Sequence, residues 1–165
     1  MELTSSAFAN GQPIPKKYTG AGANVSPPLT WSDPPEGTRS LALICDDPDA
    51  PSAKNPRPEG PWVHWVIYNI PADVRSLPEG LPRQAKLEKP AGALQGRNDF
   101  SGNNIGYSGP MPPPGSGPHR YFFKIYALDT TLSLDPQSTT KAKLLEAIQG
   151  HILAEGQLMG KYARQ

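Results

Sequence analysis

The 165-residue chain has little cysteine and no excess of charge of either sign. Cys45 is the only cysteine, which excludes a disulfide within the chain and favours a reducing compartment, so we expect a cytoplasmic protein. Sixteen basic side chains against fifteen acidic ones give a formal net charge of +1, and the basic residues are scattered. This balance gives no reason to expect nucleic acid or an anionic membrane as a partner.

Long apolar runs and the common catalytic motifs are also absent. Residues 1–18 contain no apolar stretch of the length that a signal peptide or a membrane span needs. The chain has no GxSxG elbow, no phosphate loop, no dinucleotide fingerprint and no short histidine pair with metal-binding spacing. We therefore expect no membrane span, no cofactor and no metal, and we expect a binding protein rather than an enzyme.

Proline and glycine, by contrast, are abundant, with 21 and 16 residues. They punctuate the chain in a pattern typical of strands joined by turns and by ordered, stiff loops. The length and the hydrophobic content of 36% suit one domain over residues 1–165 with one sizeable core. The two longest connections cover 48–61 and roughly 89–118, and loops this long are usually functional. In the first of them we expect a cis peptide bond at Ala50–Pro51.

Three segments, residues 40–47, 62–70 and 119–129, are predicted to be strands. They are rich in β-branched and aromatic residues and are bounded by Pro, Gly and Asp. Weaker strand candidates cover residues 2–8, 27–31 and 157–163.

One helix is predicted across residues 138–156, where apolar side chains recur at three- and four-residue steps. Thr139 or Thr140 is its expected N-cap, Gly150 weakens it and Gly156 is its expected end. The recurring residues are Leu144, Leu145, Ile148 and Ile152. Because helices do not alternate with strands, parallel βαβ units do not fit, and we expect a mainly antiparallel β fold with one or two short helices.

Polar side chains are expected to gather at one end of the predicted sheet. If strands 40–47 and 62–70 pair antiparallel, Asp47 and His64 lie at the same end. If strand 119–129 enters from that end, His119 and Tyr121 join them. Strict alternation also places His64 on the same face of its strand as Trp62, Val66 and Tyr68.

Two imidazoles and a phenol supply hydrogen-bond donors, and glycine-rich turns bring backbone N–H groups close to a ligand. This set suits a small oxyanion such as phosphate, a phosphate ester or a carboxylate. A buried, free carboxylate at Asp47 would be costly and would repel that ligand. We therefore expect Asp47 to bond His64 and favour its charged form, with His119 as a donor on the pocket wall.

Other interpretations are weaker. A lone strand or helix histidine is more often structural, and His151 is set aside for that reason. Asp47 and His64 with Ser108 or Ser116 form an imaginable triad, but the spacing does not select a serine. Two histidines and an aspartate also suit a metal, without a short ligand pair to support it. Trp62 and Trp65 are expected to be core and pocket wall rather than stacking platforms.

At these residues the sequence resembles the phosphatidylethanolamine-binding protein family, also called the Raf kinase inhibitor-like family. The segments that resemble it cover nearly the whole chain in family order, and "DPDAP…WVHW" and "GPMPPPGSGPHRY" are the most specific. The ending, without an extra C-terminal helix, is similar to the bacterial and archaeal branch.

The resemblance implies a β-sandwich with a small anion pocket near one end. Met111 stands where some family members carry Gly or Cys, which affects the pocket's width. Arg120, on the opposite face of its strand, is expected to be structural. Carried onto this chain, the pocket residues are Asp47, Pro51, His64, Tyr107, Gly109, Pro112, His119 and Tyr121.

The expected function is therefore binding of a phosphate, a phosphate ester or a phospholipid head group, with a regulatory role. The alternative is an inhibitor-type interaction module for a protease or a kinase. A less favoured reading is an enzyme that uses the His and Asp cluster. The resemblance to bacterial members also suggests a homodimer.

Overall fold

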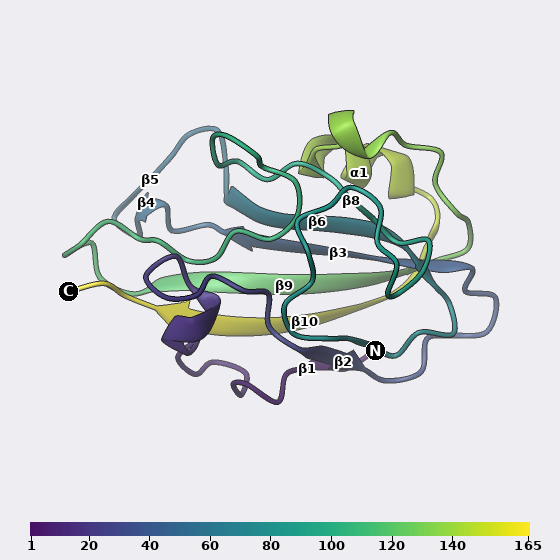
Figure 1. The fold of residues 1–165 in the computed structure, drawn as a ribbon, viewed down its shortest axis with the longest axis horizontal. Helices are drawn as coiled ribbons and strands as arrows, with labels where there is room; N and C mark the ends of the chain where they lie inside the picture. The colour runs from purple at the N-terminus through teal and green to yellow at the C-terminus, as the bar shows by residue number, and fades with distance from the viewer.

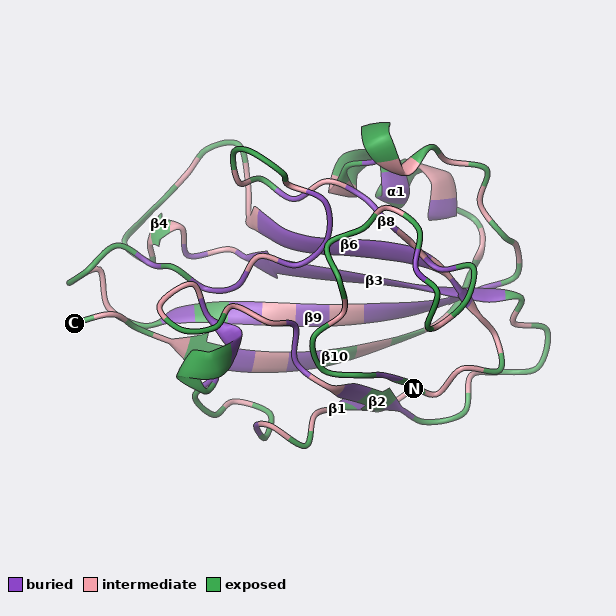
Figure 2. Ribbon diagram, in the orientation of Figure 1, coloured by how far each residue is buried: buried purple, intermediate pink, exposed green.

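The computed structural model describes all of residues 1–165 and is built around a five-stranded antiparallel sheet (Figure 1). The strands lie in the order β10 (Ile152–Tyr162), β9 (His119–Leu128), β3 (Ser40–Asp47), β6 (Trp62–Pro71) and β8 (Leu94–Gln95). Strands β3, β6 and β9 are the three predicted from composition. Figure 2 shows β3 buried along its length, as expected for the centre of a covered sheet.

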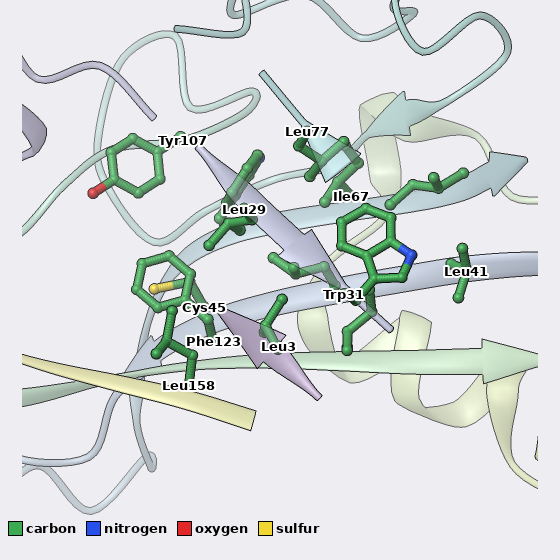
Figure 3. Close-up of a cluster of buried hydrophobic side chains, with 14 of the residues drawn as sticks. Leu3, Leu29, Trp31, Leu41, Cys45, Ile67, Leu77, Tyr107, Phe123 and Leu158 are labelled. Atoms are coloured by element: carbon green, nitrogen blue, oxygen red, sulfur yellow. The ribbon is translucent and has the colours of Figure 1, made fainter. Parts of the chain in front are cut away.

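A smaller sheet covers one face of the large one. It consists of β1 (Leu3–Thr4), β2 (Leu29–Trp31) and β7 (Ser76–Leu77). Leu29 and Trp31 from this layer pack with Leu41 and Phe123 from the large sheet in the main hydrophobic cluster (Figure 3). The predicted β-sandwich is therefore confirmed. A separate hairpin of β4 (Pro51–Ser52) and β5 (Asn55–Pro56) lies in the loop that follows β3.

The opposite face of the large sheet is covered by α1 (Lys141–Ile148), through Leu144 and Ile148. Thr140 caps this helix by accepting a hydrogen bond from the amide of Lys143. Two 3₁₀ turns, Lys16–Tyr18 and Pro136–Ser138, complete the helical content. No helix has the length and apolar character needed to cross a membrane.

The predicted extension of the helix to Gly156 is wrong. Gly150 adopts φ +83°, a left-handed conformation that ends the helix, and residues from Ile152 onward form β10. Strand β10 pairs with β9 over its length, so long-range pairing overrides the apolar spacing of the local sequence.

Strand β6 departs from strict alternation next to the sheet's end. Its pairing with β3 runs from Cys45 opposite Trp65 to Asp46 opposite Val63, which leaves His64 as an extra residue in a β-bulge. Val66 and Tyr68 consequently pack on the helix side, whereas His64 contacts Tyr121 of the other face, with ring centroids 5.2 Å apart. The expectation that His64 shares a face with Val66 and Tyr68 is wrong for this reason.

A second irregularity lies at Asn69, whose φ is +53°. The Asn69 side chain donates to the carbonyl of Leu132 and accepts from its amide, both at 2.8 Å. This clamp joins β6 to the segment that leads into α1.

We expect Asn69→Ala to be less stable than Asn69→Gly by about 1 kcal/mol. Both variants lose the two bonds to Leu132, but only alanine adds the cost of a left-handed backbone. Urea unfolding of the two variants measures the difference. Equal stabilities would mean that the bulge relaxes out of this conformation.

Candidate functional site

The ends of three strands meet at one end of the large sheet. Asp47, the last residue of β3, lies opposite Trp62 at the start of β6, and Asp46 lies opposite Phe122 near the start of β9. The predicted arrangement of these strands is confirmed. In Figure 1 this end of the sheet is on the left, where the loop after β3 and the loop before β9 come together.

A cavity of about 240 Å³ opens at this end of the sheet. Six of the eight sequence-predicted pocket residues line it, and Tyr107 and Gly109 do not. Nothing in the local sequence singles out Arg57 or Phe100, since both come from long loops. The lining consists of Asp47, Ala50, Pro51, Arg57, Trp62, His64, Phe100, Met111, Pro112, Pro113, His119 and Tyr121.

Tyr107 and Gly109 instead hold the loop that leads to the cavity. The Tyr107 hydroxyl donates to the carbonyl of Tyr18 at 2.5 Å, and its ring packs against Trp65. The amide of Gly109 donates to Oδ1 of Asn24 at 2.7 Å. A Cβ at Gly109 would stand 2.3 Å from the Tyr18 carbonyl oxygen, so only glycine permits this approach.

The buried carboxylate of Asp47 pairs with His119. Its Oδ2 lies 2.6 Å from Nδ1 of His119, and its Oδ1 accepts the amide of Asp49 at 2.7 Å. Only 3% of Asp47 and 1% of His119 is exposed. Burial raises the pKa of Asp47, although the bond to His119 acts in the opposite direction.

The expected bond between Asp47 and His64 is therefore wrong. The antiparallel register brings His119 past the end of β3, beside Asp47, while the bulge in β6 sets His64 deeper along the strand. The Nδ1 atom of His64 is bonded instead to the carbonyl of Ser108, at 2.6 Å.

His119 has no ring nitrogen left for a ligand. Its Nε2 lies 3.0 Å from Oγ of Ser116, and that hydroxyl donates to the carbonyl of Pro113 at 2.7 Å. The ring stacks on Tyr121 with centroids 6.3 Å apart. The expectation that His119 is a donor to the ligand is therefore wrong: His119 supplies a wall and a hydrogen-bond partner for Asp47, and the imidazole nitrogen open to the cavity belongs to His64.

His64 is held as a neutral imidazole. Its Nδ1 must carry a proton to bond the Ser108 carbonyl, and its ring packs edge-on against Phe100 and Tyr121. Burial lowers the pKa of His64 to about 4, so Nε2 carries a lone pair at neutral pH.

Nε2 of His64 and the hydroxyl of Tyr121 both belong to cavity-lining residues and make no hydrogen bond to another side chain, although the backbone of Gly109 also lies against the His64 ring. Every fully enclosed polar side-chain atom in the molecule is hydrogen-bonded, so these two must be open to the cavity. Burial raises the pKa of Tyr121 far above its ordinary value, and its hydroxyl therefore remains a donor.

Ion pairs fix the loop after β3. Asp49 accepts from the amide and Nε of Arg120, each at 2.9 Å, and from its Nη2 at 3.0 Å; the guanidinium lowers the pKa of Asp49. Arg120 thus has the structural contacts expected for it, and the cis bond expected at Ala50–Pro51 is present.

Arg57 is the one Lys or Arg side chain in the cavity lining. Its guanidinium lies over the Trp62 ring at 4.9 Å and donates to Asp99 at 3.0 Å. No group of three or more His, Cys, Asp or Glu side chains is placed to hold a metal ion.

Comparison with known proteins identifies the family. Residues 4–163 match the family model described as "Phosphatidylethanolamine-binding protein". The chain belongs to the phosphatidylethanolamine-binding protein (PEBP) family.

PEBP relatives from bacteria and archaea match over almost the whole chain. A UPF0098 protein from Methanothermobacter thermautotrophicus is 49% identical over 99% of each chain. The crystal structure of a putative PEBP homolog from Chlamydia trachomatis is 45% identical, with a TM-score of 0.84 and coverage of 99% of this chain and 97% of that one. E. coli YbcL, described as a new member of the mammalian PEBP family, is 35% identical, with a TM-score of 0.86 and coverage of 99% and 98%. The resemblance stated from the sequence is confirmed.

We expect Asp47→Asn to remove the proton from Nδ1 of His119. An asparagine has one acceptor oxygen, so it cannot accept both the Asp49 amide and the His119 ring. With the oxygen on the Asp49 amide, its NH₂ group faces Nδ1, which must then accept. Long-range ¹H–¹⁵N NMR spectra report the protonation of each ring nitrogen. A change at His64 in place of one at His119 would contradict the assigned pairing.

The low pKa of His64 predicts a specific loss of stability in acid. The unfolded chain takes up the proton near pH 6.5 and the folded chain only near pH 4, so this contribution is complete above pH 6.5 and is lost as pH falls to 4. The loss is about 3 kcal/mol.

The control for this effect is His64→Asn, which keeps a donor for Ser108 but cannot titrate. Denaturant unfolding of both proteins from pH 7 to pH 4 should show the parent losing stability relative to the variant. A difference that stays constant over this range would show that His64 titrates normally.

Proposed function

We propose that this PEBP-family protein binds a small oxyanion in the cavity at the end of β3: a phosphate, a phosphate ester, a phospholipid head group or a carboxylate. The observation that carries the proposal is that Nε2 of His64 and the Tyr121 hydroxyl have no side-chain partner although the two residues are only 2% and 1% exposed. Buried polar groups normally have partners, and a pair left open at a small cavity favours a ligand that supplies them.

The rest of the lining supports a small group rather than a whole lipid. The volume of about 240 Å³ is at the low end for ligand sites, and its walls are largely aromatic and proline side chains. Arg57 is the one cationic side chain in this lining that can attract an anion, although Asp99 partly compensates its charge.

The proposal is one of binding rather than catalysis. Ser116 lies beside His119, but it is not part of the cavity lining and its hydroxyl donates to Pro113. His119 has both ring nitrogens engaged, so it is poorly placed to activate a nucleophile at the ligand.

Three further parts of the proposal come from the sequence. The resemblance favours a regulatory role and a homodimer. The lone thiol of Cys45, which is buried, favours a reducing compartment such as the cytoplasm.

One observation favours the alternative of an inhibitor-type module for a protease or a kinase. Met111 lines the mouth of the cavity from the proline-rich loop and is 41% exposed, an apolar contact of the kind that protein partners use. Binding of a defined protein that is lost in Met111→Glu but kept in Tyr121→Phe would favour this alternative.

Removal of the Tyr121 hydroxyl tests the anion site. We expect Tyr121→Phe to weaken binding of inorganic phosphate about tenfold, because one hydrogen bond in the cavity is lost. Isothermal titration calorimetry measures the change.

The matched control is Tyr107→Phe, which removes another buried hydroxyl outside the cavity. It should bind phosphate as the parent does, even if it is less stable. Absence of phosphate, phosphate-ester and carboxylate binding by the parent, or equal binding by Tyr121→Phe, would refute the proposed site.

A further inference from the structure

The two open atoms of the cavity have opposite hydrogen-bonding needs. The Tyr121 hydroxyl donates, whereas Nε2 of neutral His64 accepts, because the single ring proton is used on the Ser108 carbonyl. A ligand that satisfies both must therefore accept one hydrogen bond and donate another. This is a requirement on the ligand's chemistry, beyond its size and charge.

Burial of His64 outweighs the groups that favour its charged, double-donor form, which are the backbone of Ser108 and Gly109 and the carboxylates of Asp46 and Asp99. The charged and titratable groups that face it are Asp46 and Asp47 of β3, His119 and Tyr121 of β9, and Arg57 and Asp99 of the loops. Each carboxylate among them is already bonded: Asp47 to His119, Asp46 to Lys141 and Asp99 to Arg57. Edge-on contact with two aromatic rings excludes water from the imidazole and opposes its protonation further.

A fully ionised oxyanion has only acceptor oxygens. Placed against the lone pair of Nε2, such an oxygen would leave a buried acceptor facing another acceptor, which is strongly unfavourable. An acid group that retains one hydrogen avoids this, since its O–H donates to Nε2 while another oxygen accepts from Tyr121.

We propose that the cavity selects oxyanions that carry their own acidic hydrogen, namely inorganic phosphate and phosphomonoesters as monoanions, over sulfate esters and phosphodiesters. The inference rests on the proposed function and narrows its ligand class, because phospholipid head groups such as phosphoethanolamine diesters lack the P–OH hydrogen.

The charge of the lining agrees with a monoanion. Arg57 is its only Lys or Arg, and this cation is partly compensated by Asp99. The carboxylate of Asp47 is present in the same lining, so a second negative charge on the ligand would be poorly matched.

The proton balance sets the expected discrimination. At pH 7 a phosphomonoester lies about one unit above its second pKa near 6, so roughly a tenth of it carries the required hydrogen. A diester or a sulfate ester must instead draw the proton onto His64, whose pKa is about 4. The pKa of the phosphomonoester and the pKa of His64 differ by about two units, which corresponds to about 100-fold in affinity.

The experiment compares methyl phosphate, methyl sulfate and dimethyl phosphate by titration calorimetry at pH 7. Methyl sulfate has nearly the shape of methyl phosphate and the charge of its monoanion, but no acidic hydrogen. We expect methyl phosphate to bind about 100-fold more tightly than either analogue. Its affinity should fall about tenfold per pH unit above its second pKa. Equal affinity for methyl phosphate and methyl sulfate, or a flat pH profile, would overturn the inference and leave the proposed anion site standing.

The His64→Asn variant assigns the effect to its residue. Asparagine can donate to Ser108 in place of Nδ1 but offers no acceptor at the position of Nε2. The ratio of methyl phosphate to methyl sulfate affinity should fall toward one in this variant. A ratio that remains near the parent's would overturn the role of His64. Failure of the parent to bind any of the three ligands would instead refute the proposed function itself.

Discussion

The buried pair of Asp47 and His119 is the interaction on which the cavity depends. A carboxylate at the end of a fully buried central strand would be destabilising without a partner, and His119 and the Asp49 amide supply its bonds. Both oxygens of the Asp47 carboxylate are hydrogen-bonded in this arrangement. Because His119 is hydrogen-bonded to Asp47, the imidazole of His64 is left open to the cavity. The different roles of the two histidines therefore follow from this one bond.

The different roles of His119 and His64 depend in turn on a single extra residue in β6. The bulge at His64 moves its ring to the face that carries Tyr121, where Phe100 and the Ser108 carbonyl enclose it. The surrounding loops are fixed by separate anchors: Asp49 to Arg120 on one side and Asn24 to Gly109 on the other. A site held in this way has little conformational freedom to lose when a small ligand binds.

The sequence predicts the sheet well because the strand signals are local. Residues 40–47 form a strand with the predicted ends, since the apolar run stops at Asp46 and Asp47 and a proline follows. It was also predictable that one end of the sheet brings together Asp47, His64, His119 and Tyr121, because this needs only antiparallel pairing of the strands. The hydrogen-bond partner of Asp47 could not be predicted in this way, because it depends on a β-bulge that the alternation of side chains does not reveal. The end of α1 was missed because β10 is defined by pairing with β9, a contact between distant parts of the chain.

The bulge therefore connects backbone geometry to the chemistry proposed for the cavity. Had His64 followed strict alternation, it would face the helix side with Val66 and Tyr68, and the cavity would contain donors but no imidazole acceptor. With the bulge, a neutral ring nitrogen and a phenol stand at the same buried space, and the only Lys or Arg in the lining is already bonded to Asp99. Charge attraction is then a weak source of selectivity, whereas an unmatched hydrogen bond in an enclosed site is a strong one. Discrimination among anions of similar size is thus set by one residue's position on a strand.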